Sequence, residues 1–202
     1  MNNNKNSYNK IVEEWDKARK EGSISSLLKK FVNSLKPHDK VLDVGCGTGY
    51  PITKYLSDYG LEVTAIDNAH EMVKKAKKLK LSNVSFFEVD FFNFKPTDKY
   101  EGIVAFDSFF HFDKHRQPDI YPKIANMLKL NGYLLFTHGK EDGEITGEMF
   151  GEKFYYSSLA TNKVVGLLES YGFEIIDLIE DYKENNDERE LIVLAKKVDC
   201  IR

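Results

Sequence analysis

A short β-branched segment, VLDV, runs directly into three alternating glycines, GCGTG, over residues 41–49. Glycine lets the backbone turn sharply after a strand and approach a ligand closely. A helix is expected next, because Tyr50-Pro51 places a proline at a first helical position, ahead of an apolar stripe over 52–59. The segment predicts a strand, a glycine turn and a helix, an arrangement that binds ligands at the carboxyl edge of open α/β sheets.

Four more β-rich segments, LEVTAID, VSFFEVD, GIVAF and YLLFTH, alternate with helical stretches after this turn. This alternation predicts an α/β fold with a parallel sheet covered on both faces. Two amphipathic helices are expected before residue 40, and the Asn-rich first six residues are expected to fray. A helix after Pro118 and Pro122 is expected to end near Asn131-Gly132. The segments FEIIDLIED and ERELIVLAKK predict an antiparallel hairpin that closes the sheet.

Composition excludes several classes of function. The 202 residues carry a net charge of -3 with 42% hydrophobic residues, so the body is globular and has no strong field for nucleic acid or anionic membranes. The cysteines, Cys46 and Cys200, lack the spacing of metal sites or redox pairs, so we expect no metal. No secretory or membrane-spanning segment is evident, and a cytoplasmic location is expected.

Acidic residues stand at the ends of three successive predicted strands, at Asp43, Asp67 and Asp90. In right-handed βαβ units these ends lie side by side, so the carboxylates and the glycine turn would share one cleft. Asp67 is placed to accept hydrogen bonds from both hydroxyls of a ribose, and Asp90-Phe91 suits the amine and face of an adenine. Asp43 would repel a pyrophosphate and favours a ligand with a positive group. A dinucleotide-binding turn would need a small residue at position 50, where Tyr50 stands. The motif GxxxxGK[ST] of a phosphate-binding loop is absent.

These residues resemble the class I S-adenosylmethionine-dependent methyltransferases, over nearly all of 40–197. The resemblance implies a Rossmann-like three-layer sandwich with a mostly parallel seven-stranded sheet whose last strand is antiparallel. It implies 1–39 as an N-terminal helical lid and 40–198 as the donor-binding domain, with 138–158 as a substrate-cap insertion. The donor-binding residues would be Asp43, Gly45, Cys46, Gly47, Thr48, Gly49, Asp67, Asn68, Met72, Asp90, Phe91 and Phe106, with Cys46 contributing its backbone.

The acceptor side is less specific in the sequence. Residues 105–112 should line the place where the methyl group points, and His111 is the best candidate for a catalytic base or an orienting residue. His111 could equally cap a helix or pack under the donor. The other candidate acceptor contacts, each also open to a packing role, are Tyr8, Trp15, Ser108, His138, Tyr155 and Tyr156.

We therefore expect a methyltransferase that transfers a methyl group to an oxygen, nitrogen or carbon atom of a small molecule. The [DN]PPY and Pro-Cys motifs of base and amide methylation are absent. A protein or RNA methyltransferase and a non-catalytic nucleoside-binding module remain as alternatives, and a dehydrogenase is the weakest.

Overall fold

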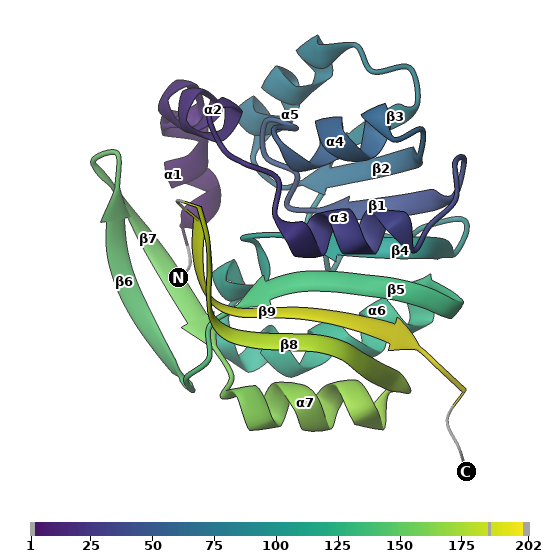
Figure 1. The fold of residues 1–202 in the computed structure, drawn as a ribbon. Helices are drawn as coiled ribbons and strands as arrows, with labels where there is room; N and C mark the ends of the chain where they lie inside the picture. The colour runs from purple at the N-terminus through teal and green to yellow at the C-terminus, as the bar shows by residue number, and fades with distance from the viewer. Residues whose placement is uncertain (1–2, 186, 200–202) are drawn as a thin grey trace.

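A seven-stranded sheet with strand order β3-β2-β1-β4-β5-β9-β8 forms the centre of the molecule (Figure 1). The computed structural model describes residues 3–185 and 187–199, so Cys200 lies outside the described residues. The strands are β1 Lys40–Val44, β2 Glu62–Asp67, β3 Val84–Glu88, β4 Tyr100–Ala105, β5 Leu128–His138, β8 Phe173–Glu184 and β9 Asp187–Lys197. β1 to β5 are parallel, and β9 lies antiparallel between β5 and β8. The expected fold, including the antiparallel last strand, is confirmed.

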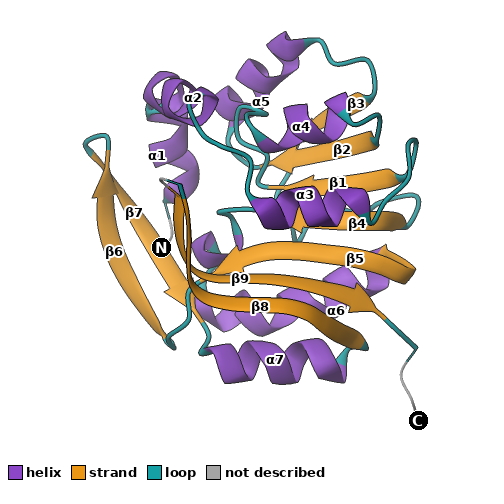
Figure 2. Ribbon diagram, viewed as in Figure 1, coloured by secondary structure: helices purple, strands orange, loops and turns teal. Residues whose placement is uncertain are grey.

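Helices cover both faces of this sheet (Figure 2). They are α3 Ser26–Asn33, α4 Ile52–Asp58, α5 His70–Ala76, α6 Ile120–Met127 and α7 Thr161–Ser170, with short 3-10 turns η1 Lys77–Leu79, η2 Phe109–His111 and η3 Lys114–Asp119. Side chains alternate along a strand, so Val41 packs in the cluster under α3 and α4 while Leu42 packs in the cluster with α6 and α7. In the part of the chain described, each helix is too short or too polar to span a bilayer.

The segment before residue 40 forms three helices where we expected two. α1 Asn4–Lys10 and α2 Val12–Lys20 are separated at Ile11, and both lie near the carboxyl ends of the parallel strands (Figure 1). α3 differs, because Leu28 and Phe31 are fully buried in the cluster that covers the sheet. The interpretation of 1–39 as one lid is therefore wrong for α3, whose apolar face belongs to the core.

Residues 143–158, within the segment expected as a substrate-cap insertion, form a β-hairpin. β6 Gly143–Met149 pairs antiparallel with β7 Glu152–Ser158, apart from the main sheet (Figure 2). β7 contacts α1, and Phe154 is buried with Ile11 and Met72. The hairpin and the first two helices thus support one another.

The helix after Pro118 also ends earlier than expected. α6 stops at Met127 and Leu128 already begins β5. Asn131 adopts a positive φ of 64°, and a side chain at Gly132 would lie 2.8 Å from the Glu101 carbonyl oxygen. Asn131-Gly132 therefore mark an irregularity inside a strand, where we had expected a helix end.

Asn4 fixes α1 to the hairpin, although we expected the first six residues to fray. Its side-chain Nδ2 donates to the Tyr155 carbonyl at 2.7 Å, and its Oδ1 accepts from the Tyr155 N–H at 2.8 Å. The Ser7 hydroxyl donates to the Lys153 carbonyl at 2.7 Å. The fraying prediction is wrong for Asn4, because a polar side chain that pairs with strand backbone is held as firmly as an apolar one.

We predict that Asn4→Ala lowers the free energy of unfolding by about 1–3 kcal/mol, because both backbone groups of Tyr155 lose a buried partner. Urea denaturation measures the change. Asn6→Ala is the matched control, since Asn6 is exposed and its side chain donates to Asn3. Equal losses in both variants would contradict the role assigned to Asn4.

Candidate active site

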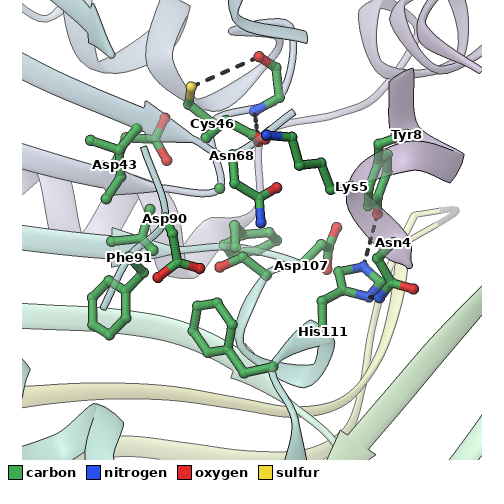
Figure 3. A pocket seen from close by; sticks show the side chains of 18 of the residues that line it. Asn4, Lys5, Tyr8, Asp43, Cys46, Asn68, Asp90, Phe91, Asp107 and His111 are labelled. Atoms are coloured by element: carbon green, nitrogen blue, oxygen red, sulfur yellow. Dashed lines mark hydrogen bonds between the residues drawn. The ribbon is translucent and has the colours of Figure 1, made fainter. Parts of the chain in front are cut away.

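A cavity of about 290 Å³ opens at the carboxyl edge of the parallel strands (Figure 3). The edge collects the ends of β1, β2 and β4 together with the turn after β3, as the sequence led us to expect. Nine of the expected donor-binding residues line it: Asp43, Gly45, Cys46, Gly47, Asp67, Asn68, Asp90, Phe91 and Phe106. Such a volume is near the lower end of ligand cavities, about 300–1,000 Å³.

The glycine turn forms the inner wall of this cavity. Gly45 and Gly47 have φ of 77° and 53°, a region that other residues seldom adopt. A side chain at Gly45 would lie 2.4 Å from the Ser108 Cβ, and one at Gly47 would lie 3.2 Å from the Trp15 Nε1. Glycine is therefore required for conformation and for close approach at both positions.

The Asp67 carboxylate ties the end of β2 to the glycine turn. Its Oδ2 accepts from the Gly47 N–H at 2.9 Å, and its Oδ1 accepts from the Ala69 N–H at 2.8 Å. Burial raises the pKa of Asp67, and these N–H donors oppose that rise. Each oxygen retains a further lone pair, so Asp67 can still accept bonds from a ligand in the cavity.

Asp43 is buried at the end of β1, where its Oδ2 accepts from the Thr53 hydroxyl at 2.5 Å. Burial raises the pKa of its carboxyl to about 7. A cationic group nearby would favour the ionised form and lower this pKa. Asp43 is therefore suited to a ligand that carries positive charge.

Aromatic rings form the far wall, beside Asp90. Phe91 stacks on Phe112 with ring centroids 5.4 Å apart and meets Phe92 edge to face. The Asp90 Oδ1 accepts from the backbone N–H of Phe92 at 2.8 Å, which shapes the turn after β3. This wall offers apolar faces next to a carboxylate, as a purine would need.

Three expected donor contacts lie outside the cavity lining: Thr48, Gly49 and Met72. Thr48 is buried, and a side chain at Gly49 would lie 2.7 Å from Leu79 Cδ1, so this glycine serves packing against η1. Met72 is buried against Ile11, Ala69 and Phe154. Its side chain faces this cluster with the N-terminal helices, so contact between Met72 and a donor stays a prediction.

A second cavity, of about 830 Å³, adjoins the first. Both are lined by the same group of side chains from α1, α2, the turn after β4 and η2, namely Tyr8, Trp15, Arg19, Asp107 and His111. We call these five residues the junction. Tyr8 of α1 and Trp15 of α2, both expected as acceptor contacts, meet edge to face with ring centroids 5.3 Å apart.

Both ring nitrogens of His111 are engaged (Figure 3). The Tyr155 backbone fixes the orientation of the Asn4 amide, whose Nδ2 lies 2.8 Å from the His111 Nδ1. Nδ1 also lies 3.3 Å from the Tyr155 carbonyl oxygen, and Nε2 lies 2.8 Å from the Tyr8 hydroxyl oxygen. Burial lowers the pKa of His111 to about 4, so the ring is neutral at pH 7.

The other expected acceptor contacts divide. His138 and Tyr156 line the second cavity, and Ser108 lines the first. The Ser108 Oγ is buried and has no hydrogen-bond partner among the described residues, so a ligand could supply one. Tyr155 lines neither cavity, and its hydroxyl donates to Glu144 at 2.6 Å.

Sequence reasoning missed the charged part of the junction. The Asp107 carboxylate contacts two guanidinium groups, Arg19 Nη1 at 3.2 Å and Arg189 Nη2 at 2.7 Å. Asp107 follows a strand end, so the rule that found the other three acids could have found it. Asn4, Arg19 and Arg189 carry no motif and reach the site from distant parts of the chain.

Comparisons with known proteins agree with this geometry. Residues 41–132 match the family model of a methyltransferase domain. The chain is 31% identical to a malonyl-[acyl-carrier protein] O-methyltransferase of Acetivibrio thermocellus, in an alignment that covers 59% of this chain and 45% of that protein. It is 25% identical to a probable thiol methyltransferase of Arabidopsis thaliana, in an alignment that covers 83% of this chain and 71% of that protein. It spans about half the length of the first curated relatives it matches.

The fold resembles that of solved methyltransferases. A 1,6-didemethyltoxoflavin-N1-methyltransferase from Burkholderia thailandensis, bound to 1,6-didemethyltoxoflavin and S-adenosylhomocysteine, superposes with a TM-score of 0.74 at 16% identity, over 96% of this chain and 87% of that one. Residues 41–132 therefore carry a methyltransferase domain, and the sheet around them has the strand order of the class I S-adenosylmethionine-dependent methyltransferase fold.

Proposed function

We propose that the chain transfers the methyl group of S-adenosylmethionine to a small-molecule acceptor bound in the larger cavity. The observation that carries this proposal is the junction, where a cavity suited to a nucleoside meets a second cavity across five shared side chains. Two adjoining cavities allow two molecules to be held in contact, and such positioning can supply roughly 7–11 kcal/mol of a barrier.

The residues of the smaller cavity fit the donor. Asp67 would accept from the ribose hydroxyls, Asp90 and Phe91 would face the adenine, and Asp43 would lie near positive charge. The backbone of the glycine turn approaches the cavity without side chains. When bound there, S-adenosylmethionine supplies a methyl group on a sulfonium, ready for in-line transfer.

The roles of the junction follow from its hydrogen bonds. His111 is neutral and occupied on both nitrogens, so we propose that it positions the Tyr8 hydroxyl and takes no proton from the acceptor. Tyr8 and Trp15 close the junction from the N-terminal helices and exclude water. The hairpin β6–β7 would form the outer wall of the acceptor site through Ile145 and Tyr156.

Calorimetry should show micromolar binding of S-adenosylmethionine. Incubation with tritiated donor and a metabolite extract should then move label into the small-molecule fraction, with formation of S-adenosylhomocysteine. Label that enters only protein or RNA would favour a macromolecular acceptor, and undetectable donor binding at millimolar concentration would reject the proposal.

Asp67→Ala should raise the Kd for S-adenosylmethionine by about tenfold or more, since hydrogen bonds to a charged group contribute about 1.5–3 kcal/mol each. Asp98→Ala is the control, because Asp98 is exposed, precedes β4 at the opposite edge of the sheet and pairs with Lys40. The melting temperatures of both variants check that the glycine turn survives. An unchanged Kd in Asp67→Ala would contradict the ribose role.

The pH profile tests the role of His111. Because its pKa lies near 4, it should cause no inflection in kcat/KM near pH 6.5, where an ordinary histidine titrates. His111→Gln should lower kcat/KM without changing the shape of the profile. Loss of a limb from the wild-type profile in this variant would show that His111 acts as a base.

A further inference from the structure

Three charged side chains from separate segments meet beside the junction. Asp107, in the turn after β4, accepts from the Arg19 Nη1 of α2 at 3.2 Å and from the Arg189 Nη2 of β9 at 2.7 Å, and the Arg189 Nε lies 2.6 Å from the other carboxylate oxygen. Their side chains are only 13%, 19% and 15% exposed. Partial burial strengthens the interactions of these charges relative to a solvated pair.

The cluster carries an excess of positive charge. Two guanidinium groups surround one carboxylate, and His111 beside them is neutral. The described hydrogen bonds of Arg189 go to Asp107 and to the Glu188 carbonyl, and that of Arg19 goes to Asp107. N–H donors of both guanidinium groups therefore remain for a molecule in the larger cavity, which both residues line.

The remaining titratable groups of the larger cavity are poor bases or lie in solvent. His138 has its Nε2 at 2.9 Å from the Gln117 Oε1, and burial lowers its pKa. Tyr8 and Tyr156 have raised pKa values because of burial. The other charged groups are Lys140, Glu141, Glu144, Asp181, Glu188 and Glu190, and all five carboxylates among them are exposed, where water screens them.

We propose that the acceptor is an organic carboxylate, that Arg189 binds its carboxylate group at the junction, and that a carboxylate oxygen receives the methyl group. This inference rests on the proposed function and names the substrate class of that site. Asp107 already lies against the Nε and Nη2 edge of Arg189. A remaining N–H of Nη1 or Nη2 would hold one oxygen of the acceptor carboxylate and leave the other oxygen to receive the methyl group.

The chemistry needs no base. The carboxylate oxygen forms a bond to the methyl carbon while the carbon–sulfur bond breaks and its electron pair stays on sulfur, which gives a methyl ester and a neutral thioether. No proton is released, because a carboxylate is already ionised at neutral pH. This agrees with a junction whose histidine is occupied on both nitrogens.

Arg189 is the residue that separates acceptor binding from donor binding. Arg19 lines both cavities, whereas Arg189 lines only the larger one. A change at Arg189 should therefore weaken acceptor binding and leave the donor in place.

The direct test uses the protein saturated with S-adenosylhomocysteine and three probes of similar shape: benzoate, benzamide and benzylamine. Calorimetry should show that benzoate binds to the wild-type protein at least about tenfold more tightly than benzamide or benzylamine. In Arg189→Gln this preference should be lost, while the Kd for S-adenosylmethionine should change less than about twofold. Lys183→Gln is the matched control, since Lys183 is an exposed cation on the same hairpin that pairs with Glu188 and lines neither cavity. The control should keep the preference for benzoate.

A second readout identifies the bond formed in the metabolite extract. Mild alkali should release the transferred label as volatile tritiated methanol, because methyl esters hydrolyse under conditions that leave methyl ethers, thioethers and amines intact. The inference would be overturned by label that is stable to alkali, or by loss of donor binding in Arg189→Gln. It would also be overturned if benzoate did not bind, or if benzamide or benzylamine bound as tightly as benzoate. Failure of the wild-type protein to bind S-adenosylmethionine would instead reject the proposed function.

Discussion

The carboxylate of Asp107 connects segments that otherwise have no reason to meet. It holds Arg19 from α2 and Arg189 from β9, which are 88 and 82 residues away along the chain. Removing the carboxylate would leave two partly buried guanidinium groups facing each other, a costly arrangement. The wall between the two cavities therefore depends on this ion cluster. The cluster also holds α2 and the start of β9 against the turn after β4.

The half of the site that we propose for the donor could be predicted from the sequence because its determinants are local. Asp43, Asp67 and Asp90 each follow a strand, and a parallel sheet brings such positions to one edge whatever the intervening helices contain. The glycine turn adds a backbone requirement that the structure shows at Gly45 and Gly47. The cavity lining leaves out Gly49 and Met72, which pack against neighbouring elements, so their contact with a donor stays a prediction.

The acceptor half could not be predicted in the same way. Asn4 lies in a polar Asn-rich segment that resembles a frayed end, and only its pairing with the Tyr155 backbone makes it part of the site. Arg189 lies in a charged strand and is distinguished only by its contact with Asp107. Such long-range polar contacts have no periodicity and no fixed spacing, so a single sequence carries no signal for them.

This division explains why relatives inform the donor more than the acceptor. The matched domain model covers 41–132, which includes the glycine turn and the acids at the strand ends. It leaves out the first two helices, the β6–β7 hairpin and Arg189, which supply most of the larger cavity. Changes in the hairpin or at Arg189 can alter the acceptor while the donor cavity stays the same, because neither lines the smaller cavity. The charge and hydrogen bonds at the junction are therefore a better guide to the acceptor of this chain than the substrates of proteins that share its sheet.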